Sequence, residues 1–326
     1  MIPATGDRPV CHHRPMLRHR DRLNRTSVCS VALLVAVVLG ACSSSRVATP
    51  RPHPQAVAAP DPAQHVHLDL VDRTRPAVDP ISVRNAAVRS LPTELYLPRA
   101  SGRVPLIVFA HGYDGDPLKF TQLFEHWTAA GFAVVAPRFP ITYTGAATGP
   151  LSRSGDYGEQ PADLTFVLDR VLESRWKSRI DVNRIGAAGL SLGGATIWGL
   201  IGNSCCRDAR IKAAVVMDGI QFGFNGGTRI RNRMPLLMFH ADHDYALPYP
   251  SAVTAYATAA PPKYFVTISG AFHAEPYENT PNVADDMVMR TTTAFWRAYL
   301  LGDTTARGEI VPDATVAGLS SAITST

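Results

Sequence analysis

The feature that most constrains the fold of this chain is the stretch Gly189-Leu190-Ser191-Leu192-Gly193, which follows a mostly apolar run at 184–188. A strand that turns into a helix through a Gly-x-Ser-x-Gly corner leaves the serine hydroxyl exposed at the tip of a strained bend. The outer glycines permit the bend because a Cβ atom at either position would clash with the neighbouring helix and strand. Acyl-transfer catalysts place their nucleophile at such a corner, so Ser191 is the first candidate catalytic residue.

Apolar runs and helical patterns alternate around this corner. The predicted strands are 91–97, 104–110, 132–136, 185–190, 211–217, 235–239 and 264–268, and the predicted helices are 164–172, 195–201, 250–259 and 282–301. Continuous apolar strands separated by helices are typical of a parallel sheet that is covered on both faces. We therefore expect one α/β domain over residues 81–304, with a mostly parallel central sheet, helices on both faces and no large lid domain.

The segments that flank this domain differ from it in composition. Residues 42–80 are rich in Pro, Ala, Arg and His without apolar periodicity, which predicts an extended tether. Residues 305–326 are small and polar and predict a C-terminal tail. Within the domain, residues 141–160 are rich in Gly, Ser and Thr and predict a long loop at an edge of the sheet.

The N-terminal segment has the pattern of an export signal. Arginines precede a short apolar stretch within 27–42, which is too short to cross a bilayer. Leu39-Gly40-Ala41-Cys42 resembles the lipobox of bacterial lipoproteins. We expect residues 1–41 to be a signal peptide and Cys42 to carry a lipid, which predicts an exported protein anchored on the outer side of the cell membrane. An ordinary cleaved signal, giving a secreted protein, is the alternative.

The charge of the chain argues against a nucleic-acid partner. Residues 1–41 carry six arginines and two aspartates, so +4 of the formal net charge of +5 belongs to the predicted signal. No basic stretch with interleaved aromatic residues remains. His240, Asp242, His243 and Asp244 have no helical spacing that would favour a metal site, so we expect solvated loop side chains and no metal there.

Other chemically active residue types have simpler interpretations. The neighbouring Cys205 and Cys206 are either a strained disulfide or two half-buried thiols, and we expect no catalytic role for them. Asp163 is expected on the solvated face of its helix, and His111 is expected to hold its loop by hydrogen bonding.

A serine hydroxyl needs a base within hydrogen-bond reach and a third group that orients the base. The candidate base is His273, just after the last predicted strand, and the candidate acid is Asp244, just after the strand that ends near Phe239. The chain order Ser, Asp, His, with each residue on a loop that follows a strand, is the α/β-hydrolase arrangement. A tetrahedral oxyanion also needs two backbone N–H donors, for which Leu192 and Tyr113 are the candidates.

At family level, residues 91–301 resemble the dienelactone-hydrolase, chlorophyllase and bacterial cutinase branch of the α/β-hydrolases. They are also similar to the plasma platelet-activating-factor acetylhydrolases. The segment 110–115 resembles the oxyanion segment of cutinases, 191–196 resembles the serine corner of both groups, and 241–248 resembles the cutinase acid loop. In that loop the second aspartate is catalytic, which implies Asp244.

The resemblance has two departures, both in Met217-Asp218-Gly219-Ile220. Polyester-degrading cutinases carry a tryptophan here, so plastic-type substrates are not implied. The acetylhydrolases take their acid from this loop, which makes Asp218 an alternative to Asp244. The Asp-x-x-x-Pro context of Asp244 favours the latter residue.

Together these features predict a serine hydrolase that cleaves carboxylic esters of short to medium acyl chains through an acyl-enzyme, without a metal or organic cofactor. Its partners would be a small-molecule ester and, through Cys42, a membrane; the oligomeric state stays open, with a monomer as the simplest expectation. Two other functions remain: an acyltransferase that uses the same triad, and a surface-binding lipoprotein that keeps the fold without turnover.

Overall fold

The structure is a computed structural model that describes residues 64–79, 86–146 and 151–326. Residue contacts group Ala58–Thr326 into one compact unit. The predicted lipidation residue Cys42 and the signal before it lie outside the described residues and stay predictions. No helix in the described part of the chain combines the length and apolar character needed to span a bilayer.

One nine-stranded sheet forms the centre of the described unit. In spatial order its strands are β1 (Gln64–Asp72), β2 (Arg89–Leu97), β4 (Ala133–Pro137), β3 (Val104–Ala110), β5 (Ile180–Leu190), β6 (Ile211–Met217), β7 (Leu236–Ala241), β8 (Lys263–Ile268) and β9 (Ser320–Ser325). The pairs from β4 through to β8 are parallel, whereas β1, β2 and β9 pair antiparallel. The predicted mostly parallel sheet is confirmed.

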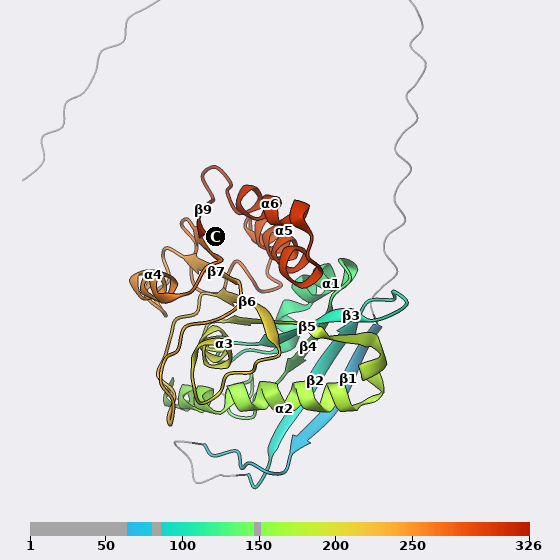
Figure 1. Cartoon of the computed structure of the whole chain (residues 1–326). Helices are drawn as coiled ribbons and strands as arrows, with labels where there is room; N and C mark the ends of the chain where they lie inside the picture. Colours follow the sequence, from blue (N-terminus) through green and yellow to red (C-terminus); the bar gives the residue numbers. More distant parts are fainter. Residues whose placement is uncertain (1–63, 80–85, 147–150) are drawn as a thin grey trace, which may run out of the picture. The chain divides into compact units, whose positions relative to one another are not determined.

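Helices cover both faces of the sheet (Figure 1). One face is covered by α2 (Gln160–Glu173), α3 (Leu192–Gly202) and α4 (Tyr249–Thr258), and the other by α1 (Thr121–Ala129), α5 (Asp285–Trp296) and α6 (Thr304–Asp313). Because successive side chains of a strand point to opposite faces, one strand can serve both cores. In β3, Leu106 and Val108 pack with the first helix group, and Ile107 and Phe109 pack with the second.

The N-terminal boundary of the domain differs from the sequence prediction. Strand β1 lies inside residues 42–80, which the sequence predicted as tether, and it pairs with β2 from Gln64 opposite Leu97 onward. The domain therefore begins well before residue 81. The side chains of His65, His67 and Asp69 face solvent, while the alternating apolar residues Val66, Leu68 and Leu70 pack on the core. This alternation was the signal that the sequence analysis missed within a segment rich in Pro, Ala, Arg and His.

The C-terminal boundary differs as well. The predicted tail at 305–326 holds most of α6 and all of β9, which pairs with β8 from Ile268 opposite Ser320. An edge strand is held by backbone hydrogen bonds and its outward side chains can be polar, so β9 carries no apolar pattern. The helix predicted over 282–301 is present as α5, which begins at Asp285, and the π-helical turn η4 (Arg297–Leu301). It ends at Gly302, whose φ of 76° is the left-handed cap that glycine favours.

A buried ion-pair cluster holds the start of α2. Arg89 is fully buried and donates to both carboxylate oxygens of Asp156 at 2.9 Å and to those of Asp163 at 2.6 and 2.7 Å. Arg75 donates a further hydrogen bond to Asp163 at 2.6 Å. The solvated position expected for Asp163 is therefore wrong, because arginines 74 and 88 residues away in sequence satisfy its carboxylate in the interior. Asp156 lies in a 3-10 turn, η2 (Leu151–Gly158), within the predicted loop.

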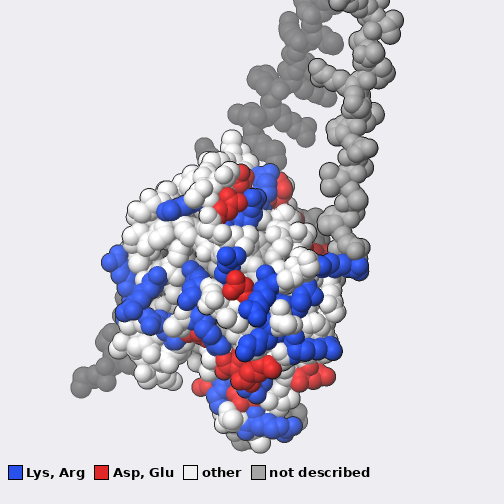
Figure 2. Space-filling model, turned by 45° about the vertical axis from the view of Figure 1, so that its right-hand side comes forward, with Lys and Arg blue, Asp and Glu red and all other residues white. Residues whose placement is uncertain are grey.

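The two ends of the parallel strands differ in what they present. At the carboxyl edge, the loops after the strands carry the candidate site residues, and within the described residues no helical subdomain is inserted above them. At the amino edge, the segments that lead into the strands carry many Lys and Arg side chains. Figure 2 brings forward the side of the molecule where the turn between β2 and β3 lies, and basic side chains spread across it.

Candidate active site

Ser191 occupies a strained corner between β5 and α3. Its φ of 57° and ψ of −119° lie outside the ordinary regions for a residue with a side chain. The corner needs its glycines: a Cβ at Gly193 would lie 2.1 Å from the carbonyl oxygen of Ala110, and one at Gly189 would lie 2.5 Å from that of Gly193. The Ser191 N–H donates to Met217 O at 2.8 Å, which ties the corner to β6. The backbone thus holds the hydroxyl in a fixed position above the sheet.

Three side chains from separate loops form a continuous chain of hydrogen bonds. The Ser191 hydroxyl lies 2.7 Å from Nε2 of His273, and Nδ1 of His273 lies 2.7 Å from Oδ2 of Asp244. Since the carboxylate can only accept, we assign the neutral tautomer of His273 with its proton on Nδ1, which leaves Nε2 to accept the serine proton. The structure therefore brings together the nucleophile, base and acid that the sequence predicted.

Asp244 is held by its own loop. Its Oδ1 atom accepts hydrogen bonds from the N–H groups of Ala246 and Leu247, both at 2.8 Å, while Oδ2 faces His273. Burial alone would raise the pKa of Asp244, but the hydrogen bonds from His273 and Leu247 outweigh it, and the pKa lies below its ordinary value. Asp244 is therefore ionised at neutral pH and can orient the imidazole.

The same contact acts in the opposite direction on His273. Burial favours the neutral imidazole, but the hydrogen bond and the negative charge of Asp244 favour the cation more strongly, and the pKa of His273 is raised. A base with a raised pKa accepts a proton from serine more readily, provided the pH leaves it neutral.

The candidate oxyanion donors lie beside the serine. Gly112 packs so close that a Cβ there would be 3.1 Å from Cβ of Ser191, and Tyr113 follows it in the loop after β3. Leu192 is the first residue of α3, where backbone N–H groups have no acceptor within the helix. Leu192 therefore follows the hydroxyl-bearing residue directly, and Tyr113 lies one residue beyond the glycine that packs against Ser191.

His111 fixes the shape of that loop. Its ring is fully buried, Nδ1 donates to Gly112 O at 2.7 Å, and Nε2 accepts from the Phe139 N–H at 3.1 Å. Burial lowers the pKa of His111 to about 4, so the ring is neutral at neutral pH. Both nitrogens are used in holding the loop, in agreement with the expected role.

Asp218, the alternative acid, contacts the histidine loop and not the imidazole nitrogen. Its Oδ1 accepts from the Ala241 N–H at 2.8 Å and from the Tyr277 hydroxyl at 3.0 Å, and its Oδ2 accepts from the Ala274 N–H at 3.2 Å. Burial raises the pKa of Asp218 above its ordinary value. Asp218 thus supports the residue that follows His273, and Asp244 is the carboxylate that the imidazole itself meets.

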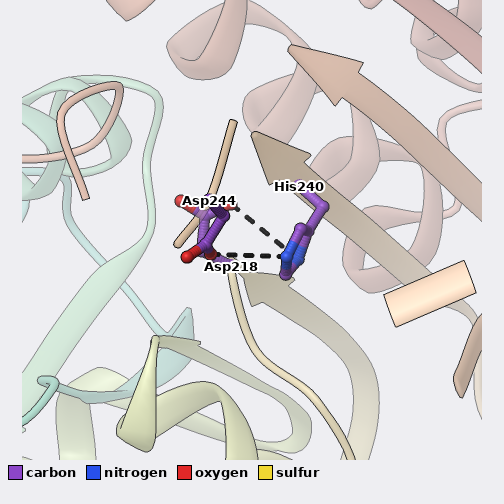
Figure 3. A group of neighbouring side chains, drawn as sticks. All are labelled: Asp218, His240 and Asp244. Atoms are coloured by element: carbon purple, nitrogen blue, oxygen red, sulfur yellow. Dashed lines mark ion pairs between the residues drawn. The ribbon is translucent and has the colours of Figure 1, made fainter. Parts of the chain in front are cut away.

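His240 is a buried neighbour of both carboxylates that the sequence analysis placed in solvent. Figure 3 shows its ring facing Asp218 and Asp244 from the end of β7. Its Nε2 donates to Leu247 O at 2.8 Å and lies 3.3 Å from Asp244 Oδ2, and its Nδ1 lies 3.9 Å from Asp218 Oδ1. The expectation of a solvated His240 is wrong because the ring packs beneath the acid loop. The continuous apolar run of β7, which is buried throughout, was the signal that could have placed His240 inside.

Asp218, His240 and Asp244 have ligand atoms within 4.8 Å of one another, a spacing that a metal ion could use. Several of the candidate ligand atoms are already engaged, although the buried Nδ1 of His240 has no hydrogen-bond partner. Asp244 Oδ2 accepts from His273, Asp218 Oδ1 accepts from Ala241 and Tyr277, and His240 Nε2 donates to a carbonyl. A cation here would compete with His273 for Asp244 Oδ2 and with two hydrogen-bond donors for Asp218 Oδ1, so the donor set fits a proton network better than a cation.

Of the two alternatives for Cys205 and Cys206, the structure contains the disulfide. It lies just beyond α3, at the opposite end of that helix from Ser191. It therefore does not belong to the candidate site.

The fold and the arrangement of these loops define an α/β-hydrolase. The sequence profile of the chlorophyllase family matches residues 68–254, more than half of the chain, so the protein belongs to this family of ester hydrolases. The matched region includes Ser191, Asp218 and Asp244 and ends before His273. A comparison with curated proteins gives no significant match.

Proposed function

We propose that this chain is a serine hydrolase that cleaves carboxylic esters with Ser191 as nucleophile, His273 as general base and Asp244 as the orienting acid. The observation that carries the proposal is the unbroken series of two 2.7 Å hydrogen bonds through His273. Membership of an ester-hydrolase family supports the same reaction class.

The reaction would begin with attack of the Ser191 oxygen on the ester carbonyl carbon while Nε2 of His273 takes the hydroxyl proton. Collapse of the tetrahedral intermediate breaks the bond to the alkoxy oxygen, which leaves as the alcohol with the proton from His273. Water then repeats the sequence on the acyl-enzyme and releases the acid. Asp244 stays ionised throughout and stabilises the imidazolium that forms at each step.

The negative charge on the carbonyl oxygen would be stabilised by the N–H groups of Leu192 and Tyr113. The loss of one such donor typically costs about 3 kcal/mol of transition-state stabilisation. The buried hydrogen bonds of His111 support this role because they hold the loop against Ser191 before substrate arrives.

Short to medium acyl groups suit the surroundings of the triad. Tyr245 and Phe272, which neighbour Asp244 and His273 in sequence, are 83% and 45% exposed, and their rings lie 5.8 Å apart. An exposed aromatic pair can contact an apolar group at the mouth of a site, but it does not enclose a long chain. A series of p-nitrophenyl esters of rising chain length tests this; a clear preference for long chains would contradict it.

The catalytic assignment is tested by labelling with a fluorophosphonate, which reacts with activated serines. We expect stoichiometric labelling of the wild-type chain and none of Ser191→Ala, together with a loss of esterase activity of about 10⁶-fold. A non-catalytic binder would leave Ser191 unlabelled. Product analysis in the presence of an alcohol separates hydrolysis from acyl transfer, because only the transferase forms a new ester as the main product.

We further propose that the protein is exported and anchored through a lipid on Cys42. The lipobox-like sequence before that residue supports this proposal. Metabolic labelling with a fatty-acid analogue should mark the wild-type protein and not Cys42→Ser, which should also leave the membrane fraction. Membrane association that is unchanged by the substitution would contradict the anchor.

A further inference from the structure

The amino edge of the sheet carries a band of exposed basic side chains. It is built by the turn between β2 and β3, by the 3-10 turn η3 (Arg175–Arg179), by the first residues of β5 and β6, and by the segment before β7. Its exposed members, which we call the basic face, are Arg99, Arg103, Arg175, Lys177, Arg184, Lys212, Arg231 and Arg233. These segments lead into neighbouring strands of the sheet, so their side chains lie along one edge (Figure 2).

Acidic residues at this edge neutralise the basic face only in part. The carboxylate of Asp181 pairs with Arg184, a member of the face. Those of Glu173 and Asp208 pair with Arg170 and Arg210, which do not belong to it. Among the residues that the structure describes, Arg103, Lys177 and Arg233 have no acidic partner within ion-pair distance. The edge therefore keeps a surplus of positive charge.

This surplus is a matter of distribution and not of overall charge. The predicted signal accounts for +4 of the formal net charge of +5, so the rest of the chain is close to neutral. Exposed charges contribute little to folding stability, and like charges gathered on one surface repel one another. A partner that carries the opposite charge would compensate this repulsion.

The N-terminal chain enters the domain at the same edge. Gln64, the first described residue, pairs with Leu97, directly before the turn that carries Arg99 and Arg103. The 43–63 segment can reach at most about 70 Å when extended. Any lipid on Cys42 would therefore tether the domain by the edge that carries the basic face.

From the charge of this face and the place where the chain enters, we propose that the basic face docks on the anionic phospholipid headgroups of a membrane surface. Lys and Arg side chains near such a surface each strengthen binding about fivefold, and the attraction falls off within a Debye length of about 8 Å. Several such residues on one face are enough to hold a tethered domain in one orientation.

That orientation leaves the candidate active site open to solvent. Ser191 follows the last residue of β5, an 11-residue strand that starts at the basic face. Ile180 pairs with Val104 and Gly189 pairs with Ala110, so this part of β5 is only as long as β3. At about 3.3 Å per residue the serine then stands roughly 25 Å from the membrane surface, which is about three Debye lengths. Docking would thus direct the candidate active site toward soluble esters without changing the electrostatics of the triad.

The test uses chains that begin at Ser43, so that neither the signal nor a lipid contributes; the compact unit with its own two cores lies wholly within them. The variant Arg103→Gln, Lys177→Gln, Arg233→Gln is compared with Arg290→Gln, Arg297→Gln, Arg307→Gln, which removes the same charge from exposed arginines on α5, η4 and α6. Co-sedimentation with phosphatidylglycerol and phosphatidylcholine vesicles gives the affinities, and thermal unfolding shows that both variants fold.

We expect the basic-face variant to bind phosphatidylglycerol vesicles about 100-fold more weakly than the parent chain, and the control variant to change less than threefold. Binding of the parent should be lost in 0.5 M salt and should be absent on phosphatidylcholine. Equal losses in the two variants, binding to neutral vesicles, or equally tight binding of duplex DNA would each overturn the proposal. Esterase activity is measured separately, so a failure here leaves the catalytic assignment untouched.

Discussion

At the carboxyl edge of the sheet, the charged side chains of Asp218, Asp244 and Arg89 are buried and bound by directed hydrogen bonds, whereas at the amino edge Lys177 and Arg233 stand in solvent. A buried charge interacts strongly with one or two fixed partners, and its pKa shifts. An exposed charge is screened, contributes little to stability, and acts only in a group on a large opposite charge. Under the two proposals made above, charged residues would act in catalysis at one edge and in recognition at the other.

The sharpest test of this contrast is the removal of one carboxylate at each edge. Asp244→Asn should lower kcat about 10⁴-fold, because the amide no longer selects the productive tautomer of His273 or stabilises its cation. Glu173→Gln, an equal change on an exposed side chain of α2, should stay within twofold of wild type. Steady-state kinetics on a soluble ester measures both; a mild effect at Asp244 would break the assignment of the acid.

Removing a buried ion pair at the carboxyl edge should lower the free energy of unfolding far more than removing an exposed one at the amino edge. Arg89→Gln leaves Asp156 and Asp163 buried without their main cation and should lower the free energy of unfolding by about 3–5 kcal/mol at neutral pH. Arg184→Gln breaks an exposed pair with Asp181 and should cost less than about 0.5 kcal/mol. Urea unfolding measures both variants, and comparable losses would contradict the contrast.

The loss of unfolding free energy in Arg89→Gln should depend on pH in one direction. Without the guanidinium, the buried carboxylates would have folded pKa values above their unfolded values. The contribution of these carboxyl groups to the free energy of unfolding is then present at low pH and is lost as the pH rises through their folded pKa. The deficit should therefore be smallest in acid and grow toward neutral pH.

Within the carboxyl edge, Asp218 should matter less than Asp244. Asp218→Asn disturbs the acceptor for the Ala274 N–H and should reduce kcat/KM about 10- to 100-fold by displacing His273. Tyr277→Phe removes one donor to the same carboxylate and should act more weakly. If Asp218→Asn reduced turnover more than Asp244→Asn, the acid would be Asp218.

The pH profile of kcat/KM tests the buried His273–Asp244 pair, and its response to salt distinguishes that pair from the exposed charges of the basic face. Because Asp244 raises the pKa of His273, kcat/KM should fall as the pH drops through a value above 6.5, where the imidazole becomes cationic and ceases to act as a base. In Asp244→Asn this acid limb should move to lower pH. Added salt should shift the wild-type limb little, since a buried pair is weakly screened, although the same salt should abolish vesicle binding.

The smallest expected effect is that of the basic-face substitutions on esterase activity. The variant Arg103→Gln, Lys177→Gln, Arg233→Gln should hydrolyse a soluble uncharged ester with kcat/KM within twofold of wild type, because these charges lie about three Debye lengths from Ser191. A larger change in a fully folded variant would show that the two edges are coupled.

The parts of the fold that were predicted correctly are those with local signals. The strands from β2 to β8 carry apolar runs, and the turn at Ser191 carries its glycines. Strand β9 escaped prediction because its polar side chains leave no apolar pattern while the backbone still pairs. Strand β1 does alternate at Val66, Leu68 and Leu70, but this short pattern was overlooked within a segment rich in Pro, Ala, Arg and His. Asp163 and His240 were misplaced because the sequence pattern does not show the partners that make their burial possible. The partner of Asp163 is Arg89, which is distant in sequence, and that of His240 is the carbonyl of Leu247 in the following loop.

By itself, the order of residues determined the mostly parallel sheet, the nucleophile corner, and the loops that carry Ser191, Asp244 and His273, because strand ends of a parallel sheet meet at one edge. Only the tertiary structure decided which carboxylate meets the imidazole, since Asp218 and Asp244 follow neighbouring strands and differ in position by a few ångströms. It also decided that basic residues scattered from Arg99 to Arg233 share one surface. Both are properties of distance in space, and neither is encoded in the spacing of residues along the chain.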